Sequence, residues 1–145
     1  MDQNFSKITI FVVDDDDTDI MVIKRSFQKA GIENPVMVAH DGAEALDLLH
    51  SGAVPRPFII LLDLNMPVMD GHECLEEIRK DPDLMDSVVF ILTSSNSEED
   101  KARAYQNNVA GYLLKEFAGE DIKNVAAMLQ SYWQAVQMPP IRTSE

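Results

Sequence analysis

The sequence predicts an α/β fold, a doubly wound and mostly parallel sheet of five strands with helices between them. Two observations support this prediction. Five short apolar runs alternate along the chain with stretches whose apolar residues recur at helical spacing. The run "FIILLD" (58–63) is almost wholly apolar, which is typical of a strand buried on both faces of a parallel sheet. The working site of such a sheet lies at the carboxyl ends of its strands.

The first half of the chain holds three predicted strands and two predicted helices. "KITIFVV" (7–13) is β-branched and apolar, and a helix over 18–30 follows with Ile20, Ile23 and Phe27 at helical spacing and Gly31 as its stop. "VMVA" (36–39) is a second strand. A helix over 41–49 opens on Asp41 and Glu44, a capping-box spacing. The run 58–63 is the third strand.

The second half repeats the alternation. A helix over 72–80 ends before the Asp81-Pro82 pair, because the residue before proline disfavours helix. "VVFIL" (88–92) is the fourth strand, and Ser97 with Asp100 starts a fourth helix. "AGYLL" (110–114) is the fifth strand. A last helix covers 120–136 and stops before two prolines.

Composition narrows the class of protein. The chain has 145 residues, which predicts one domain. Its formal net charge is −13, from 25 acidic and 12 basic residues, which disfavours nucleic acid and favours divalent cations and basic protein surfaces. No apolar run is long enough to span a membrane, and the N-terminus has no secretory pattern. Cys74 is the only cysteine, which fits a reducing cytoplasm.

Charged and hydroxyl side chains follow four of the predicted strands. Asp14 and Asp15 follow the first strand, Asp63 ends the third, Thr93 follows the fourth and Lys115 follows the fifth. Three close carboxylates repel one another unless a cation lies among them, and oxygen ligands suit Mg²⁺ or Mn²⁺. With an ammonium and a hydroxyl opposite, these residues indicate a phosphoryl-transfer site in which Asp63 itself could be the nucleophile.

The "DDDD" run (14–17) divides into two roles on this interpretation. Asp14 and Asp15 are placed to hold metal. Asp16 and Asp17 fall where the next helix begins, where a carboxylate caps free N–H groups and meets the positive end of the helix dipole. Asp16 and Asp19 have the spacing of a capping pair.

Four segments in order, "VVDDDD", "IILLDLNMPVMDG", "ILTSS" and "GYLLK", resemble the receiver domain of two-component response regulators. The spacings also agree, with 48 residues from Asp15 to Asp63, 30 from there to Thr93 and 22 more to Lys115. The resemblance covers 7–136. It implies a flavodoxin-like fold with strand order 2-1-3-4-5, in a single receiver domain over 1–138 with a short tail over 139–145.

The resemblance also implies a metal site. Asp15 and Asp63 would bind Mg²⁺ directly, and Asp14 mostly through water. Asn65 would offer its backbone carbonyl to the metal. Mn²⁺ is an alternative ion.

Further roles follow from the same resemblance. Asp63 would accept a phosphoryl group from the phosphohistidine of a sensor kinase, and Thr93 and Lys115 would bind the phosphoryl oxygens. Tyr112 matches the switch aromatic that moves with Thr93. One departure is Glu116, since the family usually has proline after the lysine, often with a cis peptide bond.

The segments "DPDL" and "SSNSEED" and the long tail past Trp133 are similar to stand-alone receivers paired with bacterial phytochrome kinases. On this reading the phosphorylated domain acts through contacts with another protein. The last helix carries an apolar stripe, and we expect a homodimer through this helix and the fifth strand. The competing possibility is that Trp133 packs back onto its own domain.

Two other functions share part of this residue pattern. Aspartyl-phosphate hydrolases of the haloacid dehalogenase type also use a strand-end aspartate with Mg²⁺, but they carry a second aspartate where this chain has Asn65. A receiver-like module that is never phosphorylated would not need the full set of acids, Thr93 and Lys115. The sequence therefore favours a switch without enzymatic turnover of a separate substrate.

Several residues have simpler interpretations. The three histidines show no metal-ligand spacing and are expected to be structural or exposed; they are His40, His50 and His72. Cys74 is expected to be a small core residue. Ser95 and Asn65, each two residues past a site residue, are expected to flank the path of the water that hydrolyses the phosphoryl group.

Overall fold

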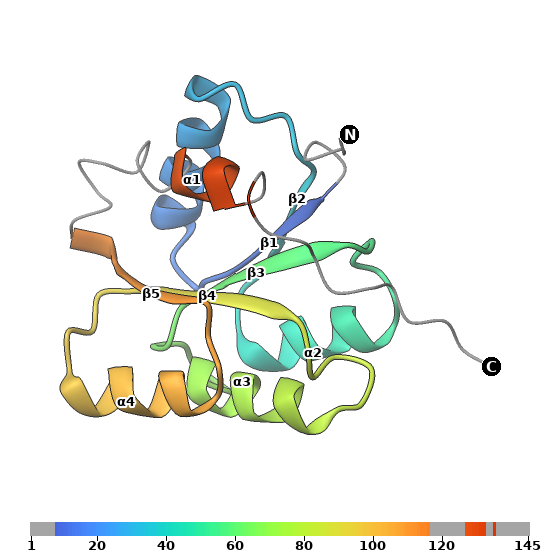
Figure 1. The fold of residues 1–145 in the computed structure, drawn as a ribbon, viewed down its shortest axis with the longest axis vertical. Coiled ribbons are helices and arrows are strands. Elements are labelled where there is room, and N and C mark those ends of the chain that lie inside the picture. Colours follow the sequence, from blue (N-terminus) through green and yellow to red (C-terminus); the bar gives the residue numbers. More distant parts are fainter. Residues whose placement is uncertain (1–7, 117–126, 133–134, 136–145) are drawn as a thin grey trace.

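Five parallel strands form the centre of the molecule, in the order β2-β1-β3-β4-β5 (Figure 1). The computed structural model describes residues 8–116, 127–132 and 135. The strands are β1 (Thr9–Val13), β2 (Val36–Ala39), β3 (Phe58–Leu62), β4 (Val88–Thr93) and β5 (Gly111–Leu114). The predicted fold class and strand order are confirmed.

Four helices connect the strands: α1 (Asp17–Lys29), α2 (Gly42–His50), α3 (Gly71–Lys80) and α4 (Glu98–Gln106). The strand and helix ends differ from the predicted ones by at most two residues, as is usual for fraying ends. Residues 127–132 and 135 are helical, and the rest of the predicted last helix lies outside the described residues. In the described part of the chain, no helix has the length and apolar character that a membrane span requires.

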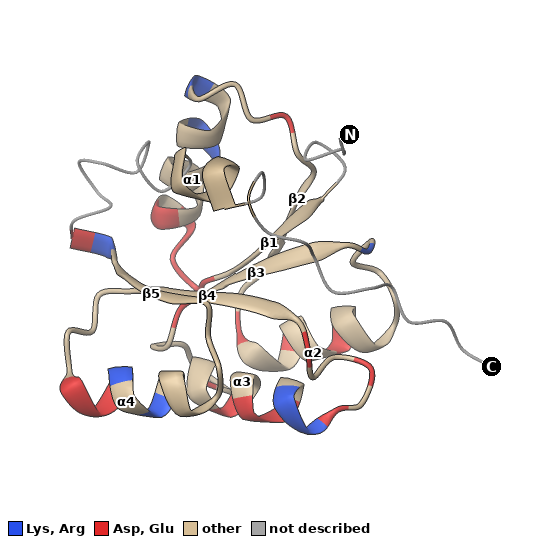
Figure 2. Cartoon of the chain, in the orientation of Figure 1, with Lys and Arg blue, Asp and Glu red and all other residues tan. Residues whose placement is uncertain are grey.

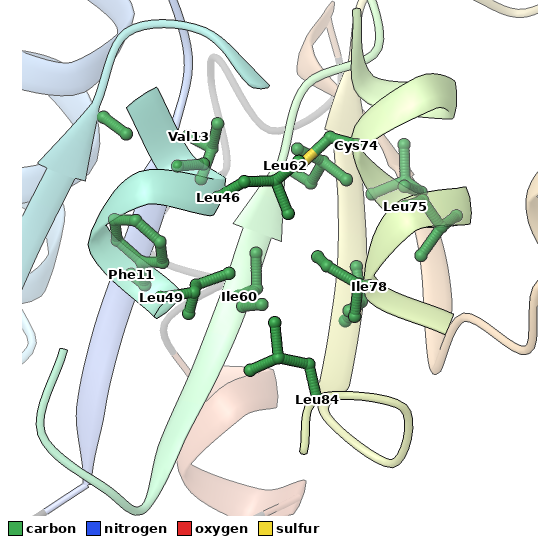
Figure 3. Packing of buried hydrophobic residues seen from close by; sticks show 14 of the residues in the cluster. Phe11, Val13, Leu46, Leu49, Ile60, Leu62, Cys74, Leu75, Ile78 and Leu84 are labelled. Carbon is green, nitrogen blue, oxygen red and sulfur yellow. The ribbon is translucent and has the colours of Figure 1, made fainter. Parts of the chain in front are cut away.

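Helices cover both faces of the sheet. Figure 1 shows α1 and the helical segment 127–132 on one face, with α2, α3 and α4 on the other. Successive side chains of a strand point to opposite faces, so Phe11 and Val13 pack toward α2 and α3 while Ile10 and Val12 pack toward α1. Figure 3 shows the first of these two cores, in which side chains of β1 and β3 meet those of α2 and α3. Burial on both faces explains the nearly continuous apolar runs in the sequence.

Aspartates cap the starts of α1, α2 and α3, and Ser97 caps α4. At α2, Asp41 accepts a hydrogen bond from the N–H of Glu44 (2.8 Å), but the Glu44 carboxylate accepts from the N–H of His40 (2.7 Å), so the predicted capping box is only half formed. A complete capping box stands instead at α3. There Asp70 accepts from the N–H of Glu73 (2.9 Å), and Glu73 accepts from the N–H of Asp70 (3.1 Å). This cap fixes the end of the β3–α3 loop, which borders the site.

Candidate functional site

The strand register brings Asp14 and Asp63 together. Val13 of β1 pairs with Leu62 of β3, so each aspartate stands one residue beyond a matched pair. The N–H of Asp63 donates to the carbonyl of Val13 (2.9 Å), which extends the ladder to the site. Asp14 and Asp63 are 2% and 5% exposed, which is unusual for carboxylates and calls for a compensating charge.

Asp15 completes an acidic cluster with these two residues. Carboxylate oxygens of Asp14, Asp15 and Asp63 lie within 4.8 Å of one another, and Asp15 is exposed. Figure 2 shows acidic residues along the segment that joins β1 to α1. Three oxygen donors, one of them open to solvent, fit a hard divalent cation that keeps some of its water.

Lys115 supplies the positive charge at this edge. Thr93 pairs with Leu114, so the lysine stands one residue beyond the last pair of β4 and β5. Its Nζ lies 2.7 Å from Asp14 Oδ2 and 3.0 Å from Asp63 Oδ2. Its side chain is 17% exposed. Among the described residues the cis peptide bond is Arg56–Pro57, so the bond from Lys115 to Glu116 is trans.

The electrostatics of the site follow from this arrangement. Burial raises the pKa of the Asp14 carboxyl, although the hydrogen bonds from Lys115 and from the N–H of Asp16 oppose the rise. Burial by itself would lower the pKa of Lys115, but its contacts with carboxylates outweigh burial and raise it above its ordinary value. The ammonium is therefore charged at neutral pH, and it balances part of the negative charge of the cluster.

The third contact of Lys115 was missed from the sequence. Asp19 Oδ2 lies 2.7 Å from its Nζ, so the predicted pairing of Asp16 and Asp19 as caps is wrong for the Asp19 side chain. Asp16 is the N-cap of α1, as predicted, and accepts from the N–H groups of Thr18 and Asp19. Asp17 lies in the first turn and its carboxylate contacts His40.

Thr93 and Tyr112 both contact Ser95 in the β4–α4 loop. Thr93 is the last residue of β4 and is fully buried, and its Oγ1 lies 3.4 Å from the N–H of Ser95. The Tyr112 hydroxyl donates to the carbonyl of Ser95 (2.9 Å), and burial raises the Tyr112 pKa. The two residues predicted to form a switch are thus connected through one loop residue.

Asn65 lies beside the predicted acceptor. It is exposed, and its N–H donates to Asp63 Oδ1 at 3.3 Å. Asn65 therefore lies next to the acidic cluster, on its solvent-exposed side. Its predicted role as a carbonyl ligand to metal stays a prediction, as does the role of Ser95 and Asn65 in guiding water.

The histidines have different environments. His40 and His50 are half exposed and contact Asp17 and Asp81, which agrees with the expectation. His72 is 5% exposed, and its Nε2 lies 2.9 Å from Asp100 of α4. This contact between α3 and α4 had no signal in the sequence beyond the two residue types.

Cys74 is buried as expected. It lies in α3 as part of the core that α2 and α3 share with the sheet. Burial raises the pKa of its thiol to about 12, so the group stays protonated and behaves as a small apolar residue.

Comparisons with known proteins agree with this geometry. Residues 10–127 match the family model described as the response regulator receiver domain. The chain is 37% identical over 127 residues to the probable methanogenesis regulatory protein FilR2 of Methanothrix harundinacea, covering 86% of this chain and 82% of that one. It is 33% identical over 135 residues to response regulator Rcp1 of Synechocystis sp., covering 90% and 92%.

Solved structures give the same result. The phosphorylated cyanobacterial phytochrome response regulator RcpA superposes with a TM-score of 0.83 at 30% identity, covering 92% of this chain and 99% of that one. The Mn²⁺-bound form of Rcp1 superposes with a TM-score of 0.81 at 32% identity and the same coverage. With its strand order, its acidic cluster and the lysine at the same sheet edge, the chain belongs to the family of response regulator receiver domains.

Proposed function

We propose that this receiver domain works as a phosphorylation switch in which Asp63 accepts the phosphoryl group. The observation that supports this most is the Lys115 ammonium, which lies between the buried carboxylates of Asp14 and Asp63 at the carboxyl edge of the sheet. The test is phosphoryl uptake from a small donor such as acetyl phosphate. Intact mass should rise by one phosphoryl group with Mg²⁺ present and stay unchanged with a chelator.

The proposed chemistry is an in-line displacement at phosphorus. A carboxylate oxygen of Asp63 forms a bond to the phosphorus of a phosphohistidine, the P–N bond breaks, and the histidine nitrogen leaves with the bonding pair and takes up a proton. Lys115 and Thr93 lie at the same sheet edge as Asp63, which supports a role for them in stabilising the phosphoryl oxygens. Thr93 and Tyr112 then change position in response to the new negative charge, and the β4–α4 loop that both contact changes with them.

A divalent ion is part of this proposal. Asp14, Asp15 and Asp63, with the Asn65 carbonyl, would hold Mg²⁺, or Mn²⁺ in its place. When bound, the ion would neutralise negative charge on the carboxylates and on the phosphoryl oxygens. The solved Mn²⁺-bound form of Rcp1, to which this chain is similar, supports the proposal of a divalent ion.

Added Mg²⁺ should therefore raise the thermal midpoint of the wild-type protein. A ligand that binds only the folded state stabilises it by about 2.7 kcal/mol at 100 times its Kd. Asp15→Asn should lose most of this response. Asp17→Asn is the matched control, because it removes the same charge from an exposed neighbour that contacts His40 instead of the cluster. Equal responses from wild type and Asp15→Asn would contradict the assignment.

Asn65 weighs against an aspartyl-phosphate hydrolase as the function. That mechanism needs an acid or base two residues after the nucleophile, and the amide of Asn65 cannot transfer protons in this way. We therefore propose that the protein has no separate enzymatic substrate, and that it catalyses only its own phosphorylation and dephosphorylation. Multiple turnover of a phosphate ester by the protein would contradict this.

The proposed partner is a sensor histidine kinase of the bacterial phytochrome type, acting in the cytoplasm. The likeness to RcpA, a phytochrome response regulator, supports this choice. Phosphoryl transfer from such a kinase to this chain, compared with transfer from an unrelated kinase, would test it. We also propose one receiver domain over 1–138, with 139–145 as a tail.

Phosphorylation is further proposed to favour a homodimer through β5 and the last helix. β5 is an edge strand of the sheet and its four residues are only partly buried, which supports this region as the interface. Trp133, expected to join the interface, lies outside the described residues. Light scattering should give the mass of two chains with Mg²⁺ and beryllofluoride, and of one chain for Trp133→Ala. A wild-type monomer at high concentration would contradict the dimer.

A further inference from the structure

His72 is a buried polar residue with no part in the proposed phosphoryl chemistry. It is the second residue of α3 and is 5% exposed, and its Nε2 lies 2.9 Å from Asp100 Oδ1. Its Nδ1 is buried without a hydrogen-bond partner among the described residues. An unpaired buried nitrogen costs stability, and an apolar side chain would avoid that cost. The contact with Asp100 is therefore the feature that an apolar residue could not supply.

Asp100 joins His72 to the β4–α4 loop. Its second oxygen, Oδ2, accepts a short hydrogen bond from the Ser95 hydroxyl. Its own N–H donates to the Ser97 hydroxyl that caps α4 (3.2 Å), so the backbone of Asp100 is fixed in the first turn. The hydrogen bonds from Ser95 and from His72 lower the Asp100 pKa, which keeps the carboxylate ionised and able to accept both.

Ser95 in turn contacts both proposed switch residues. Its N–H lies 3.4 Å from Thr93 Oγ1, and its carbonyl accepts from Tyr112 at 2.9 Å. Its hydroxyl has a single proton, and that proton is donated to Asp100. The Thr93 contact is long and weak, whereas the Asp100 contact is short and charge-assisted. Thr93 can therefore move while the Ser95 hydroxyl stays hydrogen-bonded to Asp100 of α4.

We propose that His72 and Asp100 are positioning residues that hold the Ser95 hydroxyl on α4 and keep it from orienting the water that hydrolyses the phosphoryl group. This inference rests on the proposed phosphorylation of Asp63. Ser95 lies two residues past Thr93. If its hydroxyl were released from Asp100, the hydroxyl could turn and donate to water or to a phosphoryl oxygen. Holding it lengthens the phosphoryl lifetime, and His72 contributes by fixing the Asp100 side chain.

The lifetime of the phosphoryl group on Asp63 tests this inference. Asp100→Ala and His72→Leu should each shorten it roughly threefold to tenfold, the effect of one positioned hydrogen bond. His72→Gln keeps an N–H donor and should restore most of the lifetime. Glu99→Ala is the control for Asp100→Ala, because Glu99 is an exposed acid in the same first turn of α4 and its loss should change nothing.

A double variant separates this role from general loosening of the loop. In a Ser95→Ala background there is no hydroxyl to release, so adding Asp100→Ala should leave the lifetime unchanged. The same shortening in both backgrounds would overturn the inference, and so would a wild-type lifetime in Asp100→Ala. His72→Leu should fold with an unchanged or higher thermal midpoint, because it removes the unpaired Nδ1.

Measurements on the unphosphorylated protein distinguish this inference from the proposed function. Nitrogen NMR should show a proton on Nε2 of His72, the nitrogen that contacts Asp100, and the Ser95 amide signal should shift in Asp100→Ala but not in Glu99→Ala. If wild type takes up no phosphoryl group, the proposed function fails. The NMR signals still decide whether His72 and Asp100 hold the Ser95 hydroxyl. If phosphorylation succeeds and the Ser95 signal does not move, the inference alone fails.

Discussion

Asp63→Asn should take up no phosphoryl group under conditions that phosphorylate the wild-type protein fully. Asparagine has nearly the same shape, but its amide oxygen is a poor nucleophile, so the bond to phosphorus does not form. The substitution also removes one negative charge from a crowded, buried site, so the fold should tolerate it. Loss of uptake would then reflect lost chemistry and not unfolding.

Intact mass after incubation with acetyl phosphate and Mg²⁺ measures this result, and peptide mapping locates the added group. Asp47→Asn is the matched control, since Asp47 is an exposed acid on α2 that is not part of the cluster. It should be phosphorylated like wild type. Uptake by Asp63→Asn at the wild-type rate, on another residue, would rule out the proposed acceptor.

Much of the fold could be predicted because its rules are local. Strands buried on both faces must be apolar throughout, and helices that cover a sheet must repeat their apolar residues every three or four positions. The carboxyl ends of parallel strands lie at one edge of the sheet, so residues that directly follow different strands are expected to lie close together. For that reason the sequence predicts that Asp14, Asp63 and Lys115 lie close together. In the structure the Lys115 ammonium is within hydrogen-bonding distance of both carboxylates.

The missed contacts depend on how helices turn about their axes. Asp19 has a capping spacing, but the rotation of α1 directs its carboxylate to Lys115, 96 residues away in sequence. His72 and Asp100 meet only because α3 and α4 pack side by side. At the start of α2, the Glu44 side chain reaches His40 and not Asp41, a shift of one residue that spacing rules do not resolve. Side-chain direction on a helix needs the packed structure.

Gly71→Ala should destabilise the protein strongly and displace the proposed acceptor. Gly71 opens α3, and its N–H donates to the carbonyl of Leu64 (2.9 Å). A Cβ at this position would overlap the backbone carbonyl of Asp63 and lie 2.7 Å from Leu64 Cα. Both obstacles are backbone atoms, so no side chain can turn away, and β3 or α3 must shift. Overpacking of this kind costs about 3 kcal/mol or more when backbone must move.

Gly31→Ala separates this effect from ordinary glycine strain. Gly31 has φ +76° but open space around its Cβ position, so alanine there costs only the left-handed backbone penalty of about 1 kcal/mol. Urea unfolding of both variants should show the larger loss for Gly71→Ala. Because Asp63 is the residue displaced, the folded fraction of Gly71→Ala should also accept phosphoryl groups more slowly, while Gly31→Ala keeps the wild-type rate. Equal losses of stability in the two variants would mean that the α3 start yields without disturbing Asp63.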